Sequence, residues 1–309
     1  MHPEIFTIGS FTLRWYGLFM ASAVFLAFWW TARTIRSRGG GLEPKSFEDG
    51  LVWAVISGIV GARFVYVATN WSDFQDSGGE VFALWHGGLS FHGGIIGGIL
   101  AFAVWGAKKK IPLRRLLDLL APPAALGIIL GRMGNVMNGD DAAGRLTDSP
   151  LGFTWPESAT GYSGTCSKWG VSVWDCLNQG GEIVRGPVHF SQLYGMAVGA
   201  ILFGILWWGG KKLREEGWLS GSYIMWYSVL RSVIEEPFRD NPLYLKVWED
   251  PSFGGASYTL TQLVSFPLAL VGLWMVLSAK GKGPSPWTGN VGEWETKEEL
   301  SEPSPDGTS

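Results

Sequence analysis

Long apolar stretches separated by short polar segments dominate the chain. A membrane-spanning helix needs about 20 mostly apolar residues to cross roughly 30 Å of hydrocarbon. Seven stretches are candidates, and they are residues 11–32, 51–71, 84–107, 116–131, 190–210, 218–234 and 253–279. The pattern predicts an all-α polytopic membrane protein with seven transmembrane helices.

Composition agrees with this prediction. Of the 309 residues, 47% are hydrophobic and 17% charged, whereas soluble proteins carry about 25% charged residues. The 18 tryptophans suit membrane–water interfaces. The formal net charge of −3 indicates no bulk partner of either sign, and we expect no binding to nucleic acid.

Lysine and arginine alternate between the two sides of the predicted bundle. Half of the 24 lie in segments 33–50, 108–115 and 211–217, whereas segment 72–83 has none and 236–252 has two. Because cytoplasmic loops carry the excess of Lys and Arg, we expect the N-terminus outside and the C-terminus in the cytoplasm.

Residues 1–280 are predicted to form one membrane domain. It would include a small extracytoplasmic head or lid at 133–189, which is too polar for a span and too long for a simple connection. Cys166 and Cys176 fall in this head, where they could form a disulfide or remain free thiols. The Pro-, Gly-, Ser- and Glu-rich residues 281–309 are expected to be a disordered cytoplasmic tail.

Ionisable residues within spans are candidate functional residues, because inserting each costs roughly 2.5–3.5 kcal/mol. Arg132 follows the fourth span, and Asn135 and Asn138 come shortly after it on a glycine-rich segment. An arginine can bind two phosphate oxygens while Asn amides donate to others. The alternative is that Arg132 pairs with Asp140 or Asp141 at a helix end.

Two further groups contain polar residues of this kind. Tyr227, Arg231 and Glu235 are spaced four residues apart and share one helix face. Glu235 could orient Arg231 in a site, or the two could form a purely structural pair. His92 lies among three glycine pairs, which permit either close helix contact or the approach of a ligand.

Together these motifs resemble those of the prolipoprotein diacylglyceryl transferase family. The matching segments are 14–17, 61–63, 87–94, 131–139, 189–194 and 227–235, which read RWYG, GAR, GGLSFHGG, GRMGNVMNG, HFSQLY and YSVLRSVIE. The resemblance runs from Pro3 to about Ala279. It departs after Gly139, where Asp140 and Asp141 stand in place of the family's usual Glu, which leaves that assignment open between them.

The resemblance implies an enzyme of the bacterial inner membrane. It would transfer the diacylglyceryl group of phosphatidylglycerol to the lipobox cysteine thiol of prolipoproteins, forming a thioether and releasing glycerol phosphate. The alternative is a phospholipid-binding or transport protein on the same fold without transferase activity. No cofactor or metal is expected, and no metal-ligand spacing such as HExxH occurs.

The resemblance also implies roles for individual residues. Arg132 and Arg231 would bind the phosphate, Glu235 would orient Arg231, and His92 would be the general base for the thiol. The implied substrate-binding residues are Tyr16, Arg63, Asn135, Asn138, Gly144, Gln192 and Tyr227.

Overall fold

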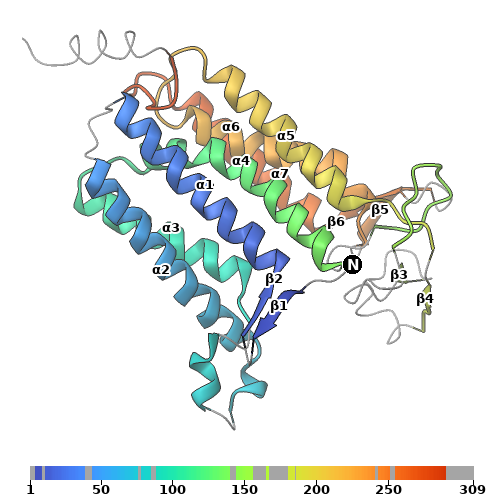
Figure 1. Ribbon diagram of the computed structural model, residues 1–309. Helices are drawn as coiled ribbons and strands as arrows, with labels where there is room; N and C mark the ends of the chain where they lie inside the picture. The colour runs from blue at the N-terminus through green and yellow to red at the C-terminus, as the bar shows by residue number, and fades with distance from the viewer. Residues whose placement is uncertain are drawn as a thin grey trace, which may run out of the picture.

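The computed structural model describes residues 4–8, 11–38, 44–75, 78–84, 88–139, 144–155, 165–166, 180–184, 186–240, 243–250 and 255–289. Seven α-helices run side by side in these ranges (Figure 1). They are α1 (Trp15–Arg38), α2 (Pro44–Thr69), α3 (Phe91–Lys108), α4 (Leu113–Asn138), α5 (Ser191–Gly209), α6 (Trp218–Leu230) and α7 (Leu260–Leu277). Five of them, α1, α2, α4, α5 and α7, are long and apolar enough to cross a membrane. The chain is therefore an all-α polytopic membrane protein.

Three predicted spans, starting at residues 11, 84 and 253, begin before their helices, and in two of them a strand precedes the helix. β1 (Glu4–Ile8) and β2 (Phe11–Arg14) form an antiparallel hairpin before α1. β5 (Leu243–Asp250) and β6 (Gly255–Thr259) form another before α7. An apolar strand extends a hydrophobic stretch as well as a helix does, so hydropathy alone did not separate them.

The fourth predicted span contains Asp118, and α4 buries this residue completely. Its carboxylate accepts hydrogen bonds from the backbone N–H of Gly217 at 2.8 Å and from the N–H and Oγ of Ser220 at 2.8 and 2.7 Å. The first N–H groups of a helix have no partner within that helix. Asp118 therefore caps α6 from the neighbouring helix α4.

The glycine pairs around His92 lie where α3 packs against α2. A Cβ at Gly61 would lie 2.6 Å from the carbonyl oxygen of Gly93, and one at Gly97 would lie 2.5 Å from that of Ser57. No side chain fits at either position, so the glycines let the two helix backbones touch. This arrangement supports the packing interpretation of the glycine motif.

Residues 281–289, which we call the C-terminal strap, fold back onto the bundle. Trp287 packs against two buried clusters, one from α1–α4 and one from α4–α6. Its Nε1 donates to the carbonyl oxygen of Leu119 at 2.9 Å. The Ser285 N–H donates to Arg214 at 2.7 Å and that of Gly289 to Gly210 at 3.0 Å. The disordered tail predicted from residue 281 therefore cannot include the strap, and residues 290–309 lie outside the described ranges.

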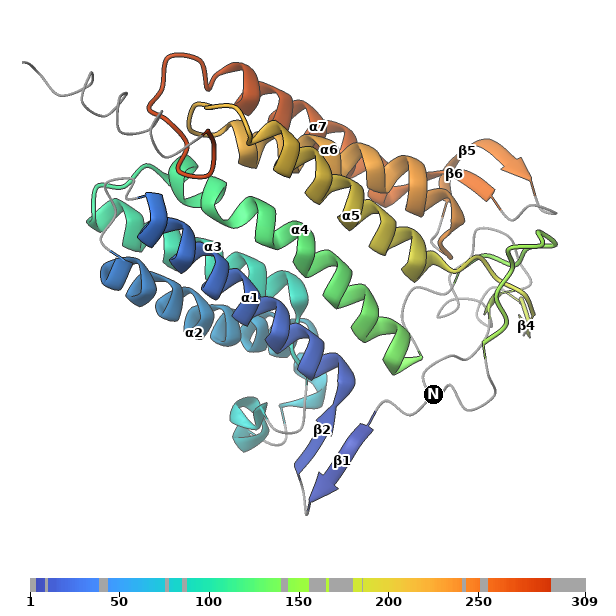
Figure 2. The same ribbon diagram turned by 45° about the horizontal axis from the view of Figure 1, so that its top comes forward.

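The described parts of the predicted head lie where α4 ends and α5 begins (Figure 2). Trp155 and Val188 are buried there, and Phe153 pairs with Val188 through two backbone hydrogen bonds of 2.8 and 2.9 Å. Cys166 belongs to β3 (Thr165–Cys166), which pairs with β4 (Ile183–Val184). Cys176 lies outside the described residues, so the disulfide stays a prediction.

Candidate active site

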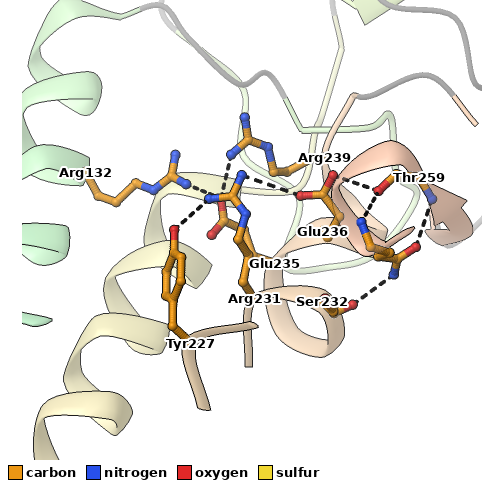
Figure 3. Close-up of polar contacts among 9 residues, drawn as sticks. Arg132, Tyr227, Arg231, Ser232, Glu235, Glu236, Arg239 and Thr259 are labelled. Carbon is orange, nitrogen blue, oxygen red and sulfur yellow. Dashed lines mark hydrogen bonds and ion pairs between the residues drawn. The ribbon is translucent and has the colours of Figure 1, made fainter. Parts of the chain in front are cut away.

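Three arginines and two glutamates meet inside the bundle (Figure 3). This ionic cluster consists of Arg132, Arg231, Glu235, Glu236 and Arg239. Their side chains are between 0% and 19% exposed. Buried charges are costly unless they are paired, and here three cations face two anions. The formal charges of these five residues therefore sum to +1.

Glu235 holds two of the arginines. Arg132 on α4 and Arg239 both donate to its Oε1, with Arg239 at 2.8 Å. Glu235 is 1% exposed, so these donors replace the water that its carboxylate loses on burial. Arg132 is thus paired with a residue far along the chain, while Asp140 and Asp141 lie outside the described residues.

Arg231 does not pair with Glu235 in the way the four-residue spacing predicted. Its Nη1 donates to the Tyr227 hydroxyl at 3.0 Å, and its Nη2 lies 3.7 Å from Oε2 of Glu236. The reason is a π-helical turn, η4 (Arg231–Glu235), which is closed by the Glu236 N–H donating to the Arg231 carbonyl. This wider turn brings residue i+5, rather than i+4, opposite Arg231.

Pro237 explains why α6 ends in this way. It has no N–H to donate four residues back, and its ring would collide with the carbonyl there. The chain continues instead as a short 3₁₀ turn, η5 (Glu236–Phe238). As a result the two consecutive glutamates face different arginines: Glu235 faces Arg132 and Arg239, and Glu236 faces Arg231.

The N-terminus of α7 fixes the other side of the cluster. Thr259 caps α7 in a reciprocal pair with Gln262, and its Oγ1 donates to Glu236 Oε1 at 2.9 Å. The Gln262 Nε2 donates to the Ser232 carbonyl of η4 at 2.9 Å. The turn that carries Arg231 is therefore tied to the next helix.

Arg132 lies in a narrow space between helices. A Cβ at Gly195 on α5 would lie 2.5 Å from Arg132 Nε, and one at Gly134 would lie 3.0 Å from the Tyr16 ring of α1. Asn135 is 8% exposed, one turn after Arg132 on α4. Asn138 ends α4, and its buried Oδ1 has no hydrogen-bond partner among the described residues. Tyr16 and both asparagines thus share the end of α4 with Arg132.

Gly144 and Gln192 lie at the same end of the bundle. Gly144 pairs with Arg239 in an antiparallel bridge. A Cβ there would lie 1.7 Å from the His189 carbonyl oxygen, so only glycine fits. Gln192 is 1% exposed in the first turn of α5, three residues before Gly195. Gly144 therefore sets the backbone beside Arg239 rather than offering a side chain.

Two predicted residues lie on other helices. Arg63 is 7% exposed on α2, and it donates to the carbonyls of Val81 and Gly88, both at 2.9 Å. It thereby holds the connection between α2 and α3, which favours a structural role over substrate binding. His92 is exposed in the first turn of α3, whose main neighbour is α2. The cluster belongs to α4 and the segment that follows α6.

The site also contains residues that were not predicted. Glu236, Arg239 and Thr259 complete it, and the spacing of Arg239 four residues after Glu235 was a usable signal. Glu236 gave no such signal, because its role depends on the π-turn. Among the described residues no group of three or more His, Cys, Asp or Glu side chains could hold a metal ion.

Fold and site together define a polytopic membrane protein whose interior holds a net-positive ionic cluster. A family model described as prolipoprotein diacylglyceryl transferase matches residues 3–278. The chain belongs to this family, and it is a transferase.

Relatives from several bacteria are similar over most of their length. The phosphatidylglycerol–prolipoprotein diacylglyceryl transferase of Thermus thermophilus is 46% identical over 276 residues, covering 89% of this chain and 97% of the relative. The protein of the same name from Deinococcus radiodurans is 38% identical, with 89% and 85% covered. That from Geobacter sulfurreducens is 33% identical, with 91% and 97% covered.

Proposed function

We propose that the chain transfers the diacylglyceryl group of phosphatidylglycerol to the lipobox cysteine thiol of prolipoproteins. A thioether forms and glycerol phosphate leaves. The observation that carries this proposal is the excess positive charge of the ionic cluster, three arginines against two glutamates. One phosphodiester anion would balance that charge.

The phosphate ligands are Arg132 and Arg231. Their side chains are 11% and 19% exposed, which leaves each a small accessible surface toward a substrate. The leaving group gains negative charge at its phosphate as the carbon–oxygen bond breaks. Preorganised arginine donors stabilise such charge without reorganising.

The other cluster residues position these two arginines. Glu235 orients Arg132 and Arg239, while Tyr227 and Glu236 orient Arg231. Asn138 offers a buried acceptor for a headgroup hydroxyl, and Asn135 and Tyr16 support the same helix end. Gln192 belongs to the wall formed by the first turn of α5.

The substrate thiol must be deprotonated to attack. A free cysteine has a pKa of about 8.5, and nearby cations favour its thiolate. We assign this effect to the ionic cluster, because His92 is exposed on a helix that packs chiefly on α2. The proton then leaves to solvent, and the thiolate displaces the phosphate oxygen from the glycerol carbon.

For the membrane topology we propose seven spans, with the N-terminus outside and the C-terminus inside a bacterial inner membrane. α3 has 18 residues, about 27 Å at 1.5 Å per residue. α6 continues through η4 and η5 from Trp218 to Phe238. The basic residues after α3 and α5 and in the C-terminal strap gather at the end away from the ionic cluster. Reporter fusions after Lys109 and Lys212 test this topology, since both sites should be cytoplasmic.

The activity is tested with the purified protein in lipid nanodiscs. Phosphatidylglycerol labelled in an acyl chain is supplied with a peptide that contains a lipobox cysteine. We expect a labelled thioether product, and none from a peptide with serine at that position. Binding of phosphatidylglycerol without this product would instead support a lipid-binding or transport protein.

A further inference from the structure

A cavity lies at the other end of the bundle, far from the ionic cluster. Its volume is about 400 Å³, within the range of small-ligand sites. Helix α5 runs from the ionic cluster to this cavity. Gly195 near its start lies against Arg132, whereas Leu206 and Lys211 near its end line the cavity. Fifteen residues of helix separate Gly195 from Gly210, roughly 22 Å at the helical rise per residue.

The walls of the cavity are apolar. Pro122 of α4, Leu206 and Trp207 of α5, and Leu219 of α6 form one part, and Trp287 of the C-terminal strap forms another. Trp207 is 48% exposed on the outside of the bundle. The cavity therefore adjoins the surface that the acyl chains of a membrane cover.

The rim of the cavity is cationic. Lys211 lines it, and Lys211 and Lys212 are exposed and form no ion pair with any described residue. Two buried carboxylates at this end of the bundle are already engaged, and Glu215, which bridges to Pro284 of the strap, does not line the cavity. Glu216 pairs with Arg115, and Asp118 caps α6. The rim can therefore attract an anion.

Trp287 and Gly289 of the C-terminal strap line one side of the cavity, and the strap lies beyond the residues 3–278 that match the family. Its Gly289 N–H donates to the Gly210 carbonyl at 3.0 Å, which fixes the strap beside Lys211. The residues that match the family model therefore do not include Trp287 and Gly289 of this cavity.

We propose that this cavity binds an anionic phospholipid, with an acyl chain against Trp207 and Trp287 and the phosphate at Lys211. Apolar walls and an unpaired cationic rim, side by side at the end of a membrane helix, match the two parts of such a lipid. The site is separate from the one at which phosphatidylglycerol would react.

The experiment uses the full chain in nanodiscs with a photoactivatable phosphatidic acid, and mass spectrometry locates the labelled peptides. We expect labelling within residues 206–219 and 281–289, reduced by excess phosphatidic acid but not by phosphatidylcholine. Lys211→Ser should lower labelling about fivefold, the effect of one cation near a charged lipid surface. Lys109→Ser, an equal change of charge at the same end, should leave it unchanged.

Three results would overturn the proposal. The first is equal competition by phosphatidylcholine, which indicates ordinary contact with surrounding lipid. The second is an equal loss in Lys109→Ser, which indicates only a diffuse charge effect. The third is labelling that appears in a chain truncated after Gly289 but not in the full chain. That result would mean that residues 290–309, and not a lipid, occupy the cavity.

Discussion

Arg132 pairs with Glu235 across the interior of the bundle, although 103 positions separate them in the chain. The pair joins α4 to the turn that follows α6. It also brings Arg132 into the same group as Arg231 and Arg239. The ionic cluster therefore depends on contacts between distant segments, and these contacts can be tested one at a time.

The first prediction concerns Glu235. Glu235→Gln keeps the shape of the side chain but leaves Arg132 and Arg239 without the charge that balances them. Removing one partner of a buried ion pair costs about 3–5 kcal/mol. We expect a clearly lower unfolding temperature in detergent and at least a roughly 100-fold loss of transfer.

Glu48→Gln is the matched control for Glu235→Gln. Glu48 pairs with Arg36, and their side chains are 27% and 64% exposed. Exposed pairs contribute only about 0–1 kcal/mol, so this variant should behave like the wild type. If both variants have the same unfolding temperature, Glu235 does not hold the cluster together.

The second prediction separates charge from geometry at the two proposed phosphate ligands. Arg132→Lys and Arg231→Lys keep the positive charge but lose the planar fork that binds two oxygens. We expect kcat to fall at least about tenfold in each, with a smaller change in unfolding temperature. Arg36→Lys serves as control. Near-normal kcat in both variants would mean that a point charge is sufficient.

The third prediction concerns Gly144. Gly144→Ala places a Cβ 1.7 Å from the His189 carbonyl oxygen, so the backbone beside Arg239 must move. We expect a loss of roughly 1–3 kcal/mol in unfolding free energy together with lower activity. In Gly204→Ala the new Cβ meets nothing within 4 Å, and alanine should stabilise α5 by about 0.5–1 kcal/mol. The measurement is Tm, which should fall in Gly144→Ala and rise in Gly204→Ala.

The fourth prediction tests the general base. Because His92 is exposed on α3, we expect His92→Gln to retain transfer within about threefold of the wild type, less than the 10²–10⁴-fold typical of a general base. A 100-fold loss of transfer activity with unchanged Tm would mean that His92 is the general base. Rescue of such a loss by added imidazole would strengthen that reversal.

The fifth prediction concerns the C-terminal strap. Trp287→Ala removes a ring that packs against both buried clusters and donates to Leu119. We expect a cost of about 3 kcal/mol, at the lower end for removing a large aromatic side chain from a core. Trp53→Ala is the control, because Trp53 is 60% exposed on α2. Equal unfolding temperatures for the two variants would mean that the strap is only loosely attached.

Much of the fold could be predicted from the sequence, because the cost of exposing backbone to lipid forces apolar stretches into helices. The hairpins before α1 and α7 could not, since hydropathy does not place the boundary between Arg14 and Trp15 or between Thr259 and Leu260. The C-terminal strap could not either. Its composition is that of a disordered segment, and only the contacts with Leu119 and Trp30, which depend on tertiary packing, fix Trp287 in place.

The site was predicted in part. Arg132, Arg231, Glu235 and Tyr227 do meet, because each is a polar residue in an apolar context and must find a partner. Which residue pairs with which was wrong for Arg231. The four-residue spacing assumes a regular α-helix, and Pro237 replaces that helix with a π-turn. The pairing of Arg132 with Glu235 depends on tertiary packing and has no local signal.

The position of the strap also governs how the protein can be made. Helices enter the membrane as they are synthesised, yet Trp287 follows the last of them. Until it emerges from the ribosome, the ring of Trp30 and the carbonyl of Leu119 lack their contact with it. A nascent chain that has reached the end of α7 already contains all seven of the described helices, but its core is still incomplete.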